Sequence, residues 1–176
     1  MNEKNENIEL DCLYKIQYGM YIISTKFGNK LNGQIATTLF QVTNNPIKIA
    51  ICLSKNTFTH ELIQKSQVFS ASILEQETPM KFIGTFGFRC GKDCDKFCNI
   101  NYATELTGCP LILDHSIVIM EAEVVQQLDV GTHTLFIGEL KSSKKIKDGI
   151  AMTYEYYHDV IKGKSPENAP TYRKSN

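Results

Sequence analysis

The 176-residue chain has no net charge and no apolar run long enough to cross a bilayer. Its 19 basic and 19 acidic side chains balance, which removes the positive surface that nucleic-acid binding depends on. A membrane helix needs ~20 consecutive apolar residues, and residues 1–7 have no apolar signal-peptide core. We therefore expect a cytoplasmic protein whose partners include neither nucleic acid nor a membrane.

Short catalytic motifs are also missing. The chain has no Rossmann-type Gly-x-Gly-x-x-Gly loop, no P-loop and no Gly-x-Ser-x-Gly hydrolase motif. None of its four histidines has a cysteine or carboxylate partner at a metal-ligand interval, which argues against a zinc hydrolase. The sequence therefore offers no side-chain catalytic dyad.

The six cysteines are predicted to be reduced thiols, because no secretory signal is present and a chain of this length needs no disulfide. Cys90, Cys94 and Cys98 recur every four residues. That spacing differs from the Cys-x2-Cys pairs that hold zinc or iron–sulfur clusters. We expect no metal site and regard these cysteines as incidental.

One hydrophobic core fits this chain length, and no break in composition divides residues 1–161, which we assign to one domain. Residues 162–176 contain two prolines and few apolar side chains. They are predicted to form a flexible C-terminal tail.

Apolar and alternating segments between turn residues predict strands near residues 20–24, 32–40, 47–53, 68–74, 117–125 and 132–141. Helical spacing predicts short helices at 8–18, after Thr57, and at 78–86. Glu121 and Glu123 indicate a solvent-facing side of the 117–125 strand. The long polar stretch 87–108 is predicted to be a lid or binding loop. Hairpin order with few helices favours a mainly β, antiparallel barrel with helical caps.

The segment from Asn32 to Phe40 is strand-like but carries small or hydroxylic side chains where a buried strand usually has valine or leucine. It therefore leaves room for a flat, polar ring along five residues, which are Gln34, Ile35, Ala36, Thr37 and Thr38. The alternative is that these small residues only permit close strand packing.

The predicted helix after Thr57 begins shortly downstream, and its first turn favours an anion. Ser54, Lys55, Asn56 and Thr59 add hydrogen-bond donors there. A simple helix cap at Asn56 or Thr57 is the alternative explanation. Together, the ring wall and the helix start predict a phosphorylated aromatic cofactor.

His133 is the best remaining candidate for a catalytic acid or base. It shares a strand face with Leu135 and Ile137, so that a core or rim histidine without a catalytic role is the alternative.

Longer motifs between Leu13 and about Tyr172 share their order and spacing with one protein family. They include Tyr18-Gly19-Met20-Tyr21, residues 32–38, Gln41-Val42-Thr43, residues 69–74, Asp95-Lys96-Phe97, Gly108-Cys109-Pro110-Leu111 and residues 131–139. In these motifs the chain resembles the FMN-binding split-barrel flavin reductases, which include flavoredoxin and the flavin domain of high-molecular-weight rubredoxin. Residues 163–172 resemble the connector that leads into rubredoxin in the two-part proteins.

The resemblance implies a split β-barrel over residues 1–161 and a homodimer that binds one FMN per subunit near the interface. By matching position, Gln34 to Thr38 would lie along the flavin ring, and Ser54, Asn56 and Thr59 would hold the phosphate and ribityl chain. Lys92 or Lys96 would add positive charge. His133 would approach the face on which a nicotinamide stacks.

The expected function is the transfer of electrons from NADH or NADPH through FMN to rubredoxin, a flavodiiron-type partner or free flavin. Thr132 stands where many relatives have aspartate, which motivates a second hypothesis, an FMN-binding electron carrier that does not oxidise nicotinamide directly. A third hypothesis is an interaction or structural barrel without flavin.

Overall fold

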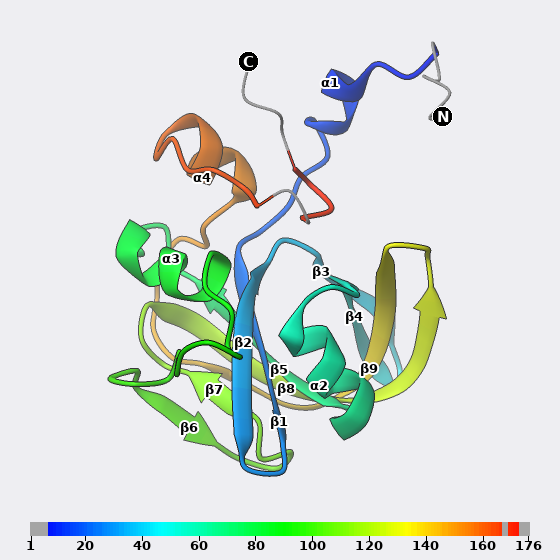
Figure 1. Ribbon diagram of the computed structural model, residues 1–176, viewed down its shortest axis with the longest axis vertical. Coiled ribbons are helices and arrows are strands. Elements are labelled where there is room, and N and C mark those ends of the chain that lie inside the picture. The colour runs from blue at the N-terminus through cyan, green and yellow to red at the C-terminus, as the bar shows by residue number, and fades with distance from the viewer. Residues whose placement is uncertain (1–6, 167–168, 173–176) are drawn as a thin grey trace.

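The computed structural model describes residues 7–166 and 169–172 and contains a seven-stranded antiparallel sheet with helices around it (Figure 1). The sheet consists of β1 (Tyr21–Phe27), β2 (Lys30–Ala36), β3 (Leu39–Asn44), β4 (Ile47–Ser54), β5 (Val68–Leu74), β8 (Ser116–Asp129) and β9 (His133–Lys145). A separate pair is formed by β6 (Tyr102–Thr104) and β7 (Pro110–Ile112). The helices are α1 (Leu10–Leu13), α2 (Phe58–Ser66), α3 (Met80–Gly87) and α4 (Tyr154–Asp159).

The sheet is open, and its two edges are joined by a very short piece of chain. The strand order is β2-β1-β5-β8-β9-β4-β3, so that β2 and β3 lie at opposite edges although only Thr37 and Thr38 separate them. Two intervening residues span no more than about 11 Å, which brings the edges together at one corner. The mainly β, split-barrel fold is confirmed. The single strand predicted over residues 32–40 is wrong, because the chain changes edges there.

The interior of the barrel is filled from six strands of the sheet's inner face and from α2. Its buried members are Ile23, Ala36, Ile49, Ile51, Leu53, Ile63, Phe69, Ala71, Ala122 and Phe136. At Gly138 a Cβ atom would lie 2.6 Å from the Phe69 ring, so glycine lets β9 approach the core closely. Burial of this apolar surface is the main force that holds α2 against the sheet.

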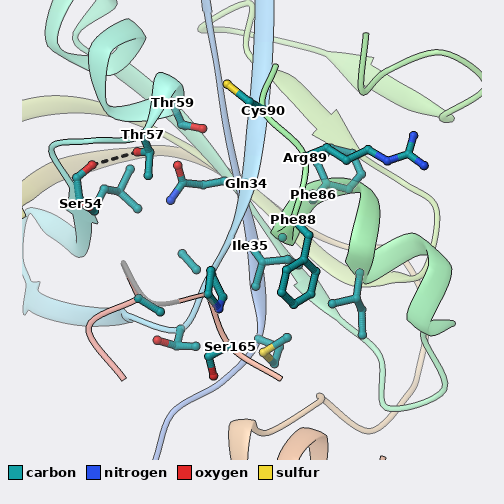
Figure 2. Close-up of a pocket in the computed structure, with 18 of the residues that line it drawn as sticks. Gln34, Ile35, Ser54, Thr57, Thr59, Phe86, Phe88, Arg89, Cys90 and Ser165 are labelled. Carbon is teal, nitrogen blue, oxygen red and sulfur yellow. Dashed lines mark hydrogen bonds between the residues drawn. The ribbon is translucent and has the colours of Figure 1, made fainter. Parts of the chain in front are cut away.

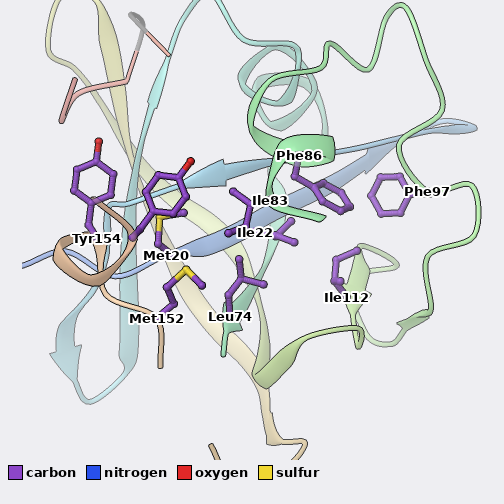
Figure 3. Packing of buried hydrophobic residues seen from close by; sticks show 10 residues of the cluster. Met20, Ile22, Leu74, Ile83, Phe86, Phe97, Ile112, Met152 and Tyr154 are labelled. Carbon is purple, nitrogen blue, oxygen red and sulfur yellow. The ribbon is translucent and has the colours of Figure 1, made fainter. Parts of the chain in front are cut away.

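A second apolar cluster lies beneath α3 and α4 and fixes both helices to the sheet (Figure 3). It includes Met20, Ile22, Leu74, Ile83, Phe86, Phe97, Ile112, Met152, Tyr154 and Tyr157. Phe86 and Phe97 meet edge to face, with ring centroids 5.8 Å apart, an arrangement that aromatic pairs favour. This contact ties the loop after α3 to the helix that precedes it.

The N-terminal helix is much shorter than predicted. Instead of residues 8–18, only Leu10–Leu13 are helical. Leu13 and Ile16 are about half exposed, at 51% and 50%, so the apolar side of the longer helix has nothing to pack against. Isolated short helices are marginal without such packing.

In the described part of the chain, no helix has the length and apolar character needed to span a membrane.

The prediction that Glu121 lies on a solvent-facing side of β8 is wrong. Glu121 is fully buried, and its carboxylate accepts hydrogen bonds from the Leu106 and Thr107 amides and from the Thr107 and Ser142 hydroxyls, at 2.6–2.9 Å. The register of β8 against β9 shifts between Glu121 and Ala122. Such a bulge interrupts the alternation of side chains that the prediction assumed. Glu123 is exposed, as predicted.

Candidate functional site

A cavity of about 320 Å³ lies between β2, the start of α2, α3 and the segment that follows α4 (Figure 2). This volume is within the range of cavities that bind small ligands. Its apolar lining comes largely from the second cluster, through Met20, Ile83, Phe86, Tyr154 and Tyr157. The remaining walls combine polar and apolar side chains and come from four separate parts of the chain.

β2 forms one wall, where Gln34, Ile35, Ala36 and the following Thr37 line the cavity. A Cβ atom at Gly33 would lie 2.6 Å from Ser24 Oγ, so the strand needs glycine to sit this close to β1. The Gln34 Oε1 atom is buried and has no hydrogen-bond partner among the described residues. A buried acceptor without a donor is unfavourable, and this wall therefore suits a ligand that brings N–H or O–H groups.

The start of α2 forms the second wall, and local hydrogen bonds fix its position. The Thr57 hydroxyl donates to the Ser54 carbonyl at 2.9 Å and accepts from the His60 amide at 3.3 Å, which makes Thr57 the helix cap. Asn32 Nδ2 donates to Thr59 Oγ1 at 2.8 Å. The first-turn amides of a helix attract anions. The capping role of Thr57 and an anion-binding role for this turn are therefore compatible.

Lys96 adds a buried positive charge beside β2. Its side chain is only 5% exposed, and Nζ donates to the Gly33 carbonyl at 2.9 Å and the Phe86 carbonyl at 3.4 Å. Among the described residues no carboxylate pairs with it. Burial lowers the pKa of Lys96 to about 8, and the thiols of Cys90 and Cys94 oppose this shift. The ammonium group is therefore mostly charged near pH 7 but lacks an anionic partner.

The opposite end of the cavity is closed by α4 and the chain after it. Tyr157 Oη donates to the Lys164 carbonyl at 2.9 Å, and Tyr154 Oη donates to the Thr171 carbonyl at 3.0 Å. The hydroxyls of Thr37 and Thr171 are hydrogen-bonded at 3.3 Å.

The predicted tail begins in this closing segment. Its residues 162–166 and 169–172 are described, and members of both stretches line the cavity. Residues 167–168 and 173–176 lie outside the described residues.

Most of the predicted cofactor-binding residues come together in this cavity. Those that line it are Gln34, Ile35, Ala36, Thr37, Ser54, Asn56, Thr59 and Lys96. Thr38, Lys55, Lys92 and His133 do not line it. Lys55 forms an ion pair with Asp129 at 2.6 Å, and Lys92 forms one with Glu61 at 2.8 Å. Both lysines face a second cavity, of about 350 Å³, on the outer side of α2.

His133, the predicted acid or base, lies next to Ser54 across the β4–β9 pair. Its Nδ1 atom is 2.8 Å from the Thr132 hydroxyl. Its Nε2 atom is buried without a partner among the described residues. The ring is thus held at the border of the cavity, and its role stays a prediction.

Several lining residues were not predicted from the sequence, although some signals pointed to them. Phe86 lies in a predicted helix, and Phe88, Arg89 and Cys90 lie in the stretch predicted as a lid or binding loop. Tyr157 gave no signal, because its contact with Lys164 depends on how α4 folds back on the chain.

Within residues 7–166 and 169–172, no group of three or more histidine, cysteine or acidic side chains is placed to hold a metal ion.

Comparisons with known proteins agree with this fold. The model of the flavin reductase like domain matches residues 13–164. A ferric-chelate reductase (NAD(P)H) of Archaeoglobus fulgidus is 45% identical over 168 residues, which cover 96% of this chain and 99% of that protein. A high molecular weight rubredoxin of Moorella thermoacetica is 42% identical over 165 residues, covering 94% of this chain and 72% of that one.

Solved structures are similar in fold at lower identity. The FMN-binding protein from Thermus thermophilus with bound 1-cyclohex-2-enone has a TM-score of 0.74 at 21% identity, over 88% of this chain and 91% of that one. At this identity the likeness concerns the fold alone.

Proposed function

The chain belongs to the family of flavin reductase-like domains, and on this premise we propose that it passes electrons from NADH or NADPH through bound FMN to an acceptor. The likeness to a ferric-chelate reductase (NAD(P)H) supports a nicotinamide donor and makes a ferric chelate one candidate acceptor. The likeness to high molecular weight rubredoxin supports rubredoxin as another. A flavodiiron-type protein and free flavin complete the set of acceptors to be tested.

The proposal rests on two features that one cavity combines. One end can bind an anion, and the wall formed by β2 has a hydrogen-bond acceptor without a donor in the described part of the chain. The amides of the first turn of α2 and the Lys96 ammonium supply positive potential, and no carboxylate among the described residues pairs with Lys96. Gln34 Oε1 supplies a buried acceptor that has no donor among the residues the structure describes. FMN carries a phosphate that suits the positive end of the cavity. Its hydroxyl groups and ring N–H can donate to an acceptor such as Gln34 Oε1.

The chain's own residues bind and orient this cofactor. Gln34, Ile35, Ala36 and Thr37 form the wall along the ring, with Thr38 at its end. Ser54, Asn56, Thr59 and Lys96 hold the phosphate and ribityl chain, and Lys55 and Lys92 contribute positive potential from the outer side of α2. When bound, FMN supplies a ring that accepts a hydride and can return electrons one at a time.

A homodimer is part of the proposal and would complete the site. Phe40, Leu128, Leu135 and Ile137 lie on one face of β3, β8 and β9, as the register places them, and Phe40 and Leu128 are 50% and 58% exposed. The same face includes Cys52, which lines the cavity. Exposed apolar surface of this kind is typical of protein–protein contacts. A second copy packed there would therefore border the cofactor.

A cytoplasmic location is proposed with it. The six cysteines are free, which agrees with a reducing compartment.

The direct test is anaerobic stopped-flow spectroscopy of the FMN-loaded protein with NADH and with NADPH. We expect the visible absorbance of FMN to bleach with at least one of them. The absorbance should then return when rubredoxin, a ferric chelate or free flavin is added as acceptor. Failure to bind FMN, or no bleaching with either nucleotide, would reject the enzyme proposal.

The alternative is an electron carrier that binds FMN but takes its electrons from another redox protein. The placement of His133 favours it, since Nδ1 is engaged by Thr132 and the ring does not line the cavity. Slow bleaching by both nucleotides together with rapid reduction by a protein donor would select this alternative.

A further inference from the structure

The loop after α3 is fixed against the first turn of α2. Lys92 Nζ lies 5.1 Å from the centroid of the Phe58 ring. At Gly91 a Cβ atom would lie 2.0 Å from Asn32 Oδ1 and 3.4 Å from the Phe58 ring, so this position requires glycine. Because Gly91 is held here, the preceding residue, Cys90, is placed beside the start of α2.

Cys90 lies where two cavities meet. It lines both the candidate cofactor cavity and the second cavity on the outer side of α2. Its thiol is free and exposed. Figure 2 shows Cys90 on the same side of the cofactor cavity as Thr57 and Thr59, with Ser165 on the opposite side. A group attached to this sulfur would therefore occupy the anion-binding end.

Two lysines lie near Cys90, and one of them, Lys92, is paired with Glu61 at 2.8 Å. The Cys90 thiol interacts electrostatically with Lys92 and with the buried Lys96, whose ammonium has no carboxylate partner among the described residues. Reactive cysteines occur in such partly exposed, electropositive places. Cys52 also lines the cavity, but burial raises the pKa of its thiol, which disfavours the reactive thiolate.

We propose that Cys90 undergoes reversible exchange with low-molecular-weight disulfides, and that this modification and the phosphate end of the cofactor exclude each other. The Cys90 thiolate attacks one sulfur of a disulfide R–S–S–R, whose S–S bond breaks. A protein–S–S–R bond forms, and R–S⁻ leaves as the reduced product. A second small thiol reverses the step. The choice of FMN as the competing ligand rests on the proposed function, but the exchange at Cys90 does not.

The exclusion follows from shared contacts. An anion at the start of α2 would lie in the cavity that both Cys90 and Lys96 line, and it would interact with the ammonium that also interacts with the Cys90 thiol. Because coupling between two binding events is reciprocal, protection of Cys90 by a ligand implies weaker ligand binding after modification. The two effects provide independent measurements of one coupling.

The experiment uses the full chain with Cys94→Ser, so that a neighbouring thiol cannot displace the attached group. Oxidised glutathione is added with and without saturating FMN, and modified peptides are quantified by mass spectrometry over time. We expect Cys90 to react first and FMN to slow it by about tenfold or more. The modified protein should bind FMN about tenfold more weakly, and a thiol reductant should restore binding.

Cys98 provides the matched control, since it is exposed in the same loop but lines neither cavity. FMN should not change its reaction rate, and FMN binding by the Cys90→Ser protein should be the same before and after oxidised glutathione. Equal reactivity of Cys90 and Cys98, or a Cys90 rate that bound FMN does not alter, would overturn the proposal.

If the protein binds no FMN, inorganic phosphate replaces it as the probe. Protection of Cys90 by phosphate would then support the exchange site while the proposed function fails. Lack of protection would reject both.

Discussion

Glu121 and Lys96 are both buried charged side chains, at 0% and 5% exposure, but the fold surrounds them very differently. Glu121 accepts four hydrogen bonds, two of them from backbone amides. Lys96 has two neutral carbonyl acceptors and a cavity beside it. Burial alone would raise the pKa of Glu121, but donors on Thr107, Ser142 and Leu106 reverse the shift and lower it. The pKa of Lys96 is lowered because the effect of burial outweighs the opposing effect of the Cys90 and Cys94 thiols.

From this difference we propose that the Glu121 charge completes the fold and that the Lys96 charge serves to bind a ligand. A buried ion is tolerated when hydrogen bonds replace the water it has lost. For Glu121 the chain supplies all of those bonds, so we assign it a structural role. For Lys96 the chain supplies only part, so we assign the remainder to the phosphate of a cofactor.

The largest effect expected is on cofactor affinity when Lys96 is replaced. Lys96→Met removes the charge and keeps most of the side-chain volume, and we expect the Kd for FMN to rise about a hundredfold. Because an incompletely paired buried charge is removed, the thermal midpoint of the flavin-free protein should not fall. Fluorescence titration and thermal unfolding measure the two quantities.

Lys92→Met is the matched control for that variant. Lys92 is exposed and paired with Glu61, and its loss should change the Kd by less than about threefold. Equal effects of the two replacements would remove the distinction between Lys96 and an ordinary surface lysine.

Glu121→Gln should affect stability and spare binding. The amide nitrogen that replaces one carboxylate oxygen would face a backbone N–H and a hydroxyl that donate to that oxygen, which should lower the free energy of unfolding by about 2–3 kcal/mol. Urea denaturation measures this loss, and the FMN Kd should stay within about twofold of the parent. A variant of full stability but weak FMN binding would reverse the roles we assign to the two charges.

The two charges should also respond in opposite pH ranges. The folded pKa of Glu121 is below 4.5, so the stability it contributes is present above that pH and is lost as pH falls through the folded value. The folded pKa of Lys96, about 8, is below 10.5, so the unfolded chain binds more protons between these values. Stability from this site therefore rises with pH across that interval.

The affinity for FMN should fall, rather than rise, as the pH increases above about 8. As the Lys96 ammonium is lost above pH 8, the FMN Kd should rise about tenfold by pH 9.5. Titrations of the parent and of Lys96→Met at each pH check this, because the variant should lack this rise. A parallel rise in the variant would assign the titration to another group.

The smallest effect expected comes from Ser142→Ala, which removes one of the four donors to Glu121. The free energy of unfolding should fall by about 1 kcal/mol. Ser143→Ala, at the exposed neighbouring position, should stay within about 0.5 kcal/mol. If the two variants are equally stable, the two backbone amides and the Thr107 hydroxyl hold the carboxylate without Ser142.

Local patterns in the sequence were sufficient for most strands and for the start of α2. The alternation of Val68–Leu74 and the Thr57 cap are encoded within a few residues, and both were recognised. The change of sheet edge between Ala36 and Leu39 was missed, because both sides of it are extended chain and only the pairing partner differs. Glu121 was misplaced for the related reason that a bulge depends on the opposite strand.

The candidate site was predictable in its residue types but not in which residues face the cavity. Lys92 and Lys96 belong to the same polar stretch, and only tertiary packing buries one and exposes the other. The position of the segment after α4 was also not predictable from its own residues. Its proline and polar content indicates a tail, whereas the tyrosine hydroxyls that bind its carbonyls come from a helix that packs back on it.

The two-residue crossing at Thr37 and Thr38 limits the width of the opening between the sheet edges by the covalent length of the backbone. Point substitutions around that opening can alter which molecules enter without altering its span. An inserted residue would relax the limit. Divergence of specificity in this chain should therefore proceed by exchanging side chains, with the loop length at this corner held constant.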